Sequence, residues 1–325
     1  MKRVLKTGVP IAFYVLLIAF LVYYVSQIEW STLANIQFDW WFFIVACVLG
    51  LTSRYWSAYI WIVILRSLGA KQAVYQPVLI YVYAKSWLGR YIPGTAPWIL
   101  GKIFFASKQG ISKNKLAVSS LLEAALQIVV QLALSIALLL FDPRIDLIPE
   151  QYRFIKWLMV LVLIGCIVAI IPPVFNRLMG LAYKLLRRGT FEREHHATWR
   201  TISSGAGLYL VGSIINGLSL FFIAKTVVPD LPYSTVFYVM GVGTLAGVAG
   251  MLIVFAPGGL GVREIVQAPL LGALMPAAVA AVVVVISRLW SVLMDLLFFA
   301  AAWSALRIRG EKEPELVGPP EPQAE

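Results

Sequence analysis

Long apolar runs constrain this chain more than any other feature of its sequence. Each run lies near the ~20 residues that an α-helix needs to cross the hydrocarbon core of a membrane. The chain has 325 residues, of which 60% are hydrophobic and only 13% are charged, and this leaves too much apolar surface for one soluble core. We therefore predict an all-α integral membrane protein with six spanning helices, at about residues 8–26, 40–65, 116–140, 155–175, 203–225 and 278–306.

Two further apolar regions, at about residues 73–106 and 233–275, are each interrupted in the middle by proline and glycine. A break of this kind at membrane depth is tolerated only where protein or a water-filled cavity surrounds the freed backbone groups. We therefore expect two re-entrant hairpins of broken helices in addition to the six spans.

The basic residues predict the orientation of the chain. Lys2, Arg3 and Lys6 place the N-terminus in the cytoplasm, whereas the segment 27–40 has no Lys or Arg and is expected outside. The distribution of Lys and Arg among the later loops places both ends of the first broken region inside, both ends of the second outside, and the C-terminus inside. The formal net charge of +11 is then explained by cytoplasmic loops, and we expect no nucleic-acid partner.

This topology predicts an inverted repeat. Residues 1–142 form span, span, hairpin and span, and residues 150–309 form the same series in the opposite direction. Paired interrupted segments at corresponding places in two halves indicate a transport site near the midplane of the membrane. We expect a single transmembrane domain over residues 1–309, followed by a disordered cytoplasmic tail, rich in Pro and Glu, over residues 310–325.

The two breaks share one pattern. The first is "GRYIPGTAPWILGK", from Gly89 to Lys102, and the second is "FAPGGLGVRE", from Phe255 to Glu264. In each, Pro and Gly end one helix, and the next helix begins with free N–H groups that attract anions. Cations close to both breaks make a phosphate head group the expected ligand. The predicted substrate-binding residues in the breaks are Arg90, Pro93, Gly94, Lys102, Pro257, Gly258, Gly259, Gly261, Arg263 and Glu264.

The glycines of "GVGTLAGVAG" have a different expected role. Small residues let membrane helices approach each other closely, so we assign Gly243 and Gly247 to helix packing. The same packing role is an alternative for the glycines in the two breaks.

Polar residues also occur inside the predicted spans. In the third span they recur every fourth residue and therefore share one helix face: Ser119, Glu123, Gln127, Gln131 and Ser135. Ionisable residues at membrane depth indicate a functional site by default, with ion pairing between helices as the structural alternative. An internal structural pair of Arg288 with Asp295 is an equally good interpretation of the last span. The predicted substrate-binding residues within the spans are Arg54, Glu123, Gln127 and Arg288.

The stretch "YIPGTAPWILGK", the following "KQGISKNKLAVSSLLEAALQ" and the later "FAPGGLGVRE" resemble the lysylphosphatidylglycerol synthase transmembrane family. This is the flippase-like domain of multiple peptide resistance factor proteins, and the resemblance extends over about residues 5–308. It implies movement of a lipid between the leaflets of a bacterial or archaeal cell (inner) membrane. Some members are linked to aminoacylated phospholipids and others to glycolipid or polyprenyl-lipid pathways. We see no soluble aminoacyl-transferase domain in the chain, so synthesis of the lipid is not the expected role.

Signatures of catalysis and of metal binding are missing from the sequence. It has no P-loop, no Ser-His-Asp set and no zinc-spaced cluster, so we predict no catalytic residue, no metal and no cofactor. His195 and His196 lie beside two glutamates in a basic loop, where a solvated loop is favoured over a metal site.

Three functions stay open at this stage. The leading one is a flippase or scramblase that moves a phospholipid or glycolipid with a phosphate-containing, anionic or zwitterionic head group between leaflets. The second is an intramembrane transferase that acts on a polyprenyl or phospholipid substrate, and the third is a non-transporting scaffold of a lipid-synthesis complex. A homo-oligomer or a partner protein of lipid synthesis is compatible with each.

Overall fold

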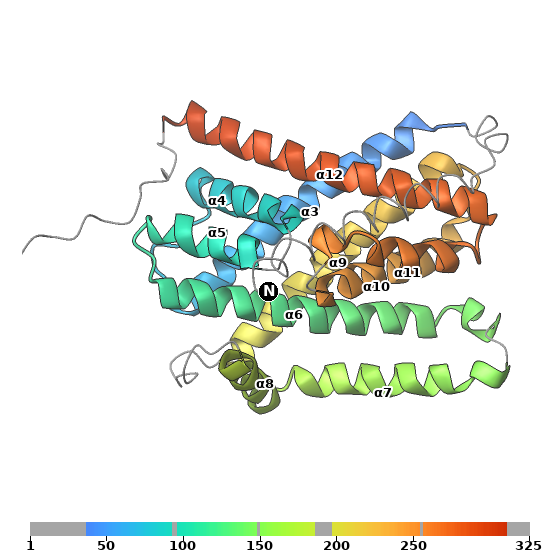
Figure 1. Cartoon of the computed structure of the whole chain (residues 1–325), viewed down its shortest axis with the longest axis horizontal. Helices are drawn as coiled ribbons and strands as arrows, with labels where there is room; N and C mark the ends of the chain where they lie inside the picture. Colours follow the sequence, from blue (N-terminus) through green and yellow to red (C-terminus); the bar gives the residue numbers. More distant parts are fainter. Residues whose placement is uncertain (1–36, 93–95, 148–149, 186–196, 254–255, 311–325) are drawn as a thin grey trace, which may run out of the picture.

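The chain is helical throughout the part that the structure describes (Figure 1). This computed structural model describes residues 37–92, 96–147, 150–185, 197–253 and 256–310, so the predicted first span at 8–26 lies outside it. The α-helices are α3 (Trp40–Ser67), α4 (Pro77–Leu88), α5 (Ala96–Ser107), α6 (Lys113–Leu140), α7 (Phe154–Ala169), α8 (Pro172–Leu185), α9 (Trp199–Val227), α10 (Val236–Leu252), α11 (Val262–Leu271) and α12 (Ala277–Ile308). The 3-10 turns are η1 (Gly89–Tyr91), η2 (Pro143–Leu147), η3 (Glu150–Tyr152), η5 (Tyr233–Thr235) and η6 (Pro257–Gly259). No strand occurs in these ranges, which confirms the all-α prediction.

Within the described ranges, five helices are long and apolar enough to cross a membrane. Four of them, α3, α6, α9 and α12, correspond to predicted spans, and the fifth joins η5 to α10 over Tyr233–Leu252. A sixth span results if the bent pair of α7 and α8 is counted as one. The chain is therefore a multi-pass membrane protein.

The predicted span at 155–175 is wrong in its last residues, because the helix bends there. α7 ends at Ala169 and α8 begins at Pro172, with an angle of 92° between the two helices. Two consecutive prolines lack the N–H groups that would continue α7, but proline fits the first turn of a new helix. Figure 1 shows α8 nearly end-on next to the end of α7, whereas α7 runs alongside α6.

The first broken region forms a hairpin of two short helices. α4 and α5 have 12 residues each. At 1.5 Å per residue each helix is about 18 Å long, so neither crosses a hydrocarbon core of ~30 Å alone. The second region is uneven, because α10 has 17 residues and α11 has 10. In Figure 1 the chain joins the first region from one end of the molecule and the second from the opposite end. The inverted repeat predicts that the two broken regions are entered from opposite sides. Because their helices differ in length, the structural equivalence of the two halves stays a prediction.

The tips of the two broken regions meet inside the molecule. η1 contacts η6, and a Cβ atom at Gly258 would lie 3.4 Å from the ring of Tyr91. Around these tips α3 packs along α9, α6 along α10 and α12 along α4. The described turns η1 and η6 therefore lie among packed helices, as freed backbone groups at membrane depth require.

The two glycines that the sequence assigns to helix packing have different surroundings in the structure. A Cβ atom at Gly243 would lie 2.4 Å from a methyl carbon of Leu220, so Gly243 allows α10 to approach α9 closely. A Cβ atom at Gly247 would have no neighbouring atom within 4 Å, and Gly247 lines a cavity. The packing role predicted for Gly247 is therefore wrong, because its face of α10 is turned towards open space.

Candidate functional site

A cavity of about 390 Å³ lies between the spans and the tips of both broken regions. Its walls come from α3 to α6 and from α9 to α12. Arg54, which lines the cavity, lies near the middle of the 28-residue helix α3, and the helical rise places it about 20 Å from either end. The cavity therefore lies near the middle of the span that α3 is expected to make across the membrane, and ionisable side chains at that depth indicate function.

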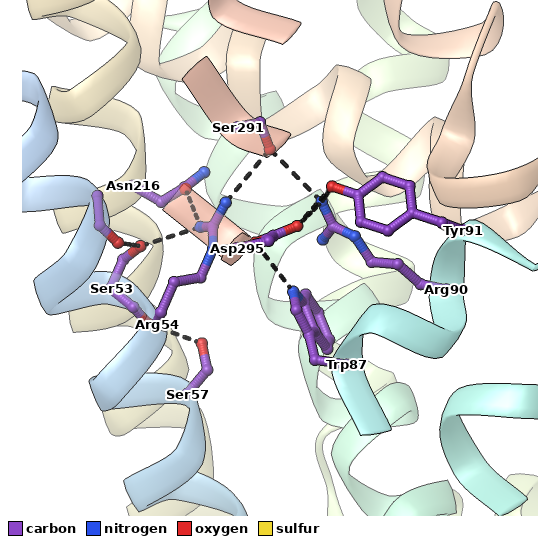
Figure 2. A network of polar contacts seen from close by, with 10 residues as sticks. Ser53, Arg54, Ser57, Trp87, Arg90, Tyr91, Asn216, Ser291 and Asp295 are labelled. Atoms are coloured by element: carbon purple, nitrogen blue, oxygen red, sulfur yellow. Dashed lines mark hydrogen bonds and ion pairs between the residues drawn. The ribbon is translucent and has the colours of Figure 1, made fainter. Parts of the chain in front are cut away.

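Asp295 is the centre of a polar network beside this cavity (Figure 2). Its side chain is fully buried, and Oδ1 accepts a hydrogen bond from Arg54 Nε at 2.7 Å. On the other oxygen, Oδ2 lies 2.8 Å from Arg90 Nη2 and accepts from Tyr91 Oη at 2.6 Å. Trp87 Nε1 also donates to Oδ1, at 3.3 Å. Since four donors occupy its carboxylate, Asp295 anchors α3, α4 and η1 to α12 and has little capacity left for a ligand.

Neutral groups fix the two arginines that meet at this carboxylate (Figure 2). Arg54 donates to Ser291 Oγ at 3.2 Å and to Asn216 Oδ1 at 3.5 Å. Arg90 donates to the same Ser291 Oγ at 3.4 Å, and its guanidinium lies 4.8 Å from the centre of the Trp87 ring. The guanidinium groups of Arg54 and Arg90 are therefore held in defined positions on the cavity wall.

A second ion pair involves the tip of the other broken region. Arg288 Nη2 donates to the carbonyl oxygen of Gly258 at 2.9 Å, and Arg288 Nε lies 3.3 Å from Glu264 Oε1. The latter contact is not a hydrogen bond, because Arg288 Nε and both oxygens of Glu264 have no hydrogen-bond partner within the described ranges. Glu264 therefore neutralises Arg288 but keeps unused hydrogen-bonding capacity.

Arg263 makes no ion pair with any residue that the structure describes, and its buried Nε atom has no hydrogen-bond partner there. Its side chain lies against two glycines, since a Cβ atom at Gly250 or at Gly259 would come within 2.9 Å of Arg263 Nε. The three other cavity arginines repel the positive charge of Arg263, and the neighbouring Glu264, which faces Arg288, attracts it. Arg263 is therefore the cavity cation with the largest need for an anionic partner.

Positive charge exceeds negative charge around the cavity. Its described lining has one carboxylate, that of Glu264, and Asp295 adds a second from behind the wall. Two of the four lining arginines are thus left without a compensating charge; the four are Arg54, Arg90, Arg263 and Arg288. An uncompensated charge away from water costs several kcal/mol, so this arrangement favours binding of an anion.

The backbone of the second break adopts the conformations that its glycines were expected to supply. The φ angles are 59° at Gly258, 72° at Gly259 and 83° at Gly261, all in the region that favours glycine. This prediction is confirmed. At Gly259 a Cβ atom would also lie 2.9 Å from the Cα atom of Gly250, so close backbone contact requires glycine there as well. The turn leads directly into α11, whose N-cap is Gly261.

Lys102 and Glu123 form a separate buried ion pair that joins α5 to α6. Tyr83 Oη donates to Glu123 at 3.0 Å, and the Lys102 ammonium lies 4.2 Å from the centre of the Trp98 ring. Neither charged residue is part of the cavity lining. The geometry favours the structural interpretation of this pair, and a contact with substrate remains only a prediction for both residues.

The other predicted residues divide into three groups. The cavity lining contains Arg54, Arg90, Gln127, Gly258, Gly259, Arg263, Glu264 and Arg288. Two predicted residues belong to the second break itself: Pro257 is part of η6, and Gly261, at the start of α11, does not line the cavity. Outside the described residues lie Pro93, Gly94, His195 and His196. Within the described residues no group of three or more His, Cys, Asp or Glu side chains could hold a metal ion.

The pairing of Arg288 with Asp295 considered from the sequence is wrong. Arg288 pairs with Glu264 instead, and the charged partners of Asp295 come from α3 and η1. Sequence reasoning also misses Tyr209 and Gln267, which line the cavity. Both are polar residues in apolar helices, but nothing in the sequence indicates which face of α9 or α11 is turned inwards.

Comparisons with known proteins agree with these features. Residues 9–298 match the family described as the lysylphosphatidylglycerol synthase TM region, a membrane lipid-related domain. No curated protein and no solved structure matches the chain. Because the match extends over most of the chain, this protein belongs to the lysylphosphatidylglycerol synthase transmembrane family.

Proposed function

We propose that this protein is a lipid flippase or scramblase that moves a lipid with a phosphate-containing head group between leaflets. The observation that carries the proposal is the excess of two arginines over carboxylates around a cavity at mid-depth. The head-group phosphate binds these arginines, and the acyl chains stay in the bilayer. Membership of a lipid-related family supports a lipid as the source of the phosphate.

The proposed phosphate position lies between Arg263 and its neighbours. Arg54 and Arg90 already share Asp295, and Arg288 already faces Glu264, whereas Arg263 has no partner among the described residues. Guanidinium groups bind phosphate oxygens through two parallel N–H groups, and charge-assisted bonds of this kind are about twice as strong as neutral ones. The phosphate therefore balances the positive charge of the arginines that no carboxylate compensates.

The apolar part of the lining favours a lipid over free phosphate. Ile253 lines the cavity and is 45% exposed, so an apolar edge of the cavity reaches the outer surface of the protein. Further along the wall, Leu121, Ile128 and Met251 are also apolar. A lipid that leaves its chains at such an edge avoids the large cost of exposing them to water.

Reconstitution of the purified protein tests this function. Vesicles contain a phospholipid with a nitrobenzoxadiazole (NBD) label on one acyl chain, and dithionite added outside removes fluorescence from the outer leaflet only. The proposal predicts that fluorescence protected in protein-free vesicles is lost in vesicles that contain the protein. Protection equal to that of protein-free vesicles, with folded protein present, would contradict leaflet exchange and favour the transferase or the scaffold.

A further inference from the structure

The cavity also contains neutral polar side chains that the arginine network leaves unused. Gln127 and Gln131 on α6, Tyr209 on α9 and Gln267 on α11 line it, and their side chains make no hydrogen bond with the residues that the structure describes. Tyr209 is 5% exposed, and its buried hydroxyl lacks any partner in that part of the chain. Gln267 is buried as well, whereas Gln127 and Gln131 are half-buried. Since buried polar groups are nearly always hydrogen-bonded, the unpartnered Tyr209 and Gln267 beside a cavity indicate a polar ligand, which the two glutamines of α6 can also reach.

The chemistry of these groups suits hydroxyl groups of a ligand. A glutamine amide offers two donors and one acceptor oxygen, and a tyrosine hydroxyl both donates and accepts. A polyol needs this mixture, because each of its hydroxyl groups also donates one hydrogen bond and accepts others. Gln127 and Gln131 are four residues apart and share one face of α6, so both can contact the same group of hydroxyls.

An ammonium group is poorly matched to the same cavity. Glu264 is the single acidic residue in the described lining, and it faces Arg288 at 3.3 Å. The two tryptophans nearest the first break are also engaged by cations. Arg90 lies over the Trp87 ring at 4.8 Å and Lys102 lies over the Trp98 ring at 4.2 Å. An ammonium group would therefore meet excess positive charge, because the charge of Glu264 is already balanced by Arg288 and both indoles at this break are occupied by cations.

We propose that the cavity prefers lipids whose phosphate carries an uncharged polyol, such as glycerol, inositol or a sugar, over lipids whose phosphate carries an ammonium group. The phosphate binds the arginines, and the hydroxyl groups bind Gln127, Gln131, Tyr209 and Gln267. The inference rests on the proposed function and adds the class of head group to it.

The test compares two acyl-labelled lipids with the same chains, NBD-phosphatidylglycerol and NBD-phosphatidylcholine, in the dithionite assay. Exchange of phosphatidylglycerol per folded protein should be about tenfold faster, which corresponds to ~1.4 kcal/mol. In Gln127→Glu the ratio of the two rates should fall about fivefold or more, because the new carboxylate repels phosphate and attracts ammonium. Gln72→Glu, in the exposed loop before α4, is the matched control and should keep the wild-type ratio.

Tyr209→Phe removes one hydroxyl from the cavity and provides a second variant with almost unchanged shape. It should slow exchange of phosphatidylglycerol about fivefold, as expected for one lost hydrogen bond of ~1 kcal/mol, and leave phosphatidylcholine unaffected. This variant decides the question if Gln127→Glu does not fold.

The outcomes separate the two proposals. Equal exchange of both lipids by the wild type would overturn the polyol preference and leave the proposed function intact. A ratio unchanged in folded Gln127→Glu and in Tyr209→Phe would also overturn it. Exchange of neither lipid would overturn the proposed function, and with it the inference that rests on it.

Discussion

Arg54 on α3 and Asp295 on α12 are 241 residues apart in the sequence, and Arg54 Nε lies 2.7 Å from Asp295 Oδ1 in the structure. The carboxylate also accepts from Tyr91 and pairs with Arg90, both in the first break. One buried side chain therefore connects two spans to a broken helix. The positions of two cavity arginines depend on it.

We expect Asp295→Asn to destabilise the protein strongly. The change leaves Arg54 and Arg90 without their carboxylate and raises the excess positive charge around the cavity. Removing one partner of a buried ion pair typically costs ~3–5 kcal/mol. Thermal unfolding of the purified variant in detergent measures this loss. Adding Arg54→Gln should recover part of it, and a double variant as unstable as the sum of the single ones would show that the two residues are not coupled.

Gly247 and Gly259 should respond differently to substitution. Gly247→Leu places a side chain in open space in the cavity, so we expect normal folding and blocked lipid exchange. Gly259→Ala should lower the melting temperature, because its φ of 72° costs an L-residue roughly 1–2 kcal/mol and its Cβ atom meets Gly250. Exchange per folded protein and melting temperature are measured for both. Normal exchange in folded Gly247→Leu would place the lipid path elsewhere.

For Lys102 and Glu123 we predict a structural role. Lys102→Met should destabilise the protein, because the buried carboxylate of Glu123 loses its charge partner. The double variant Lys102→Met, Glu123→Gln should recover stability and exchange lipid at close to the wild-type rate per folded molecule. If the double variant is well folded and inactive, the pair takes part in transport.

The topology can be tested with single cysteines in a background free of Cys47 and Cys166. A cysteine at Pro229, between α9 and η5, should react with an impermeant maleimide from outside the cell. One at Ser112, just before α6, should react only after permeabilisation, because basic loops stay in the cytoplasm. Labelling of Ser112 from outside would exclude the predicted inverted repeat.

Much of the fold could be predicted because the membrane restricts the solutions. The runs that became α3, α6, α9 and α12 are long and apolar, so their existence follows from the thickness of the bilayer alone. The Pro-Gly-Gly turn before α11 could also be predicted, because its conformation depends on local backbone freedom. The bend after Ala169 could be missed, because residues 155–175 remain apolar across it.

The partners of buried charges could not be predicted to the same degree. Asp295 lies seven residues from Arg288 on one helix face, yet its charged partners come from α3 and η1. Such pairs depend on how helices far apart in sequence are turned towards each other. Gly247 is a similar case, because small residues occur both at tight helix contacts and beside cavities. Sequence therefore indicates which residues are polar in the membrane and only structure shows what they face.

The central claim is that an arginine without a counter-ion binds the phosphate of the transported lipid. The most direct measurement is the exchange rate of NBD-phosphatidylglycerol per folded molecule for wild type, Arg263→Gln and Arg66→Gln, an exposed arginine near the end of α3. We predict that Arg263→Gln slows exchange at least about tenfold, as expected for a lost charge-assisted bond of ~1.5–3 kcal/mol, while its melting temperature without lipid is unchanged or higher. Arg66→Gln should behave as wild type. Wild-type exchange by folded Arg263→Gln would contradict the claim.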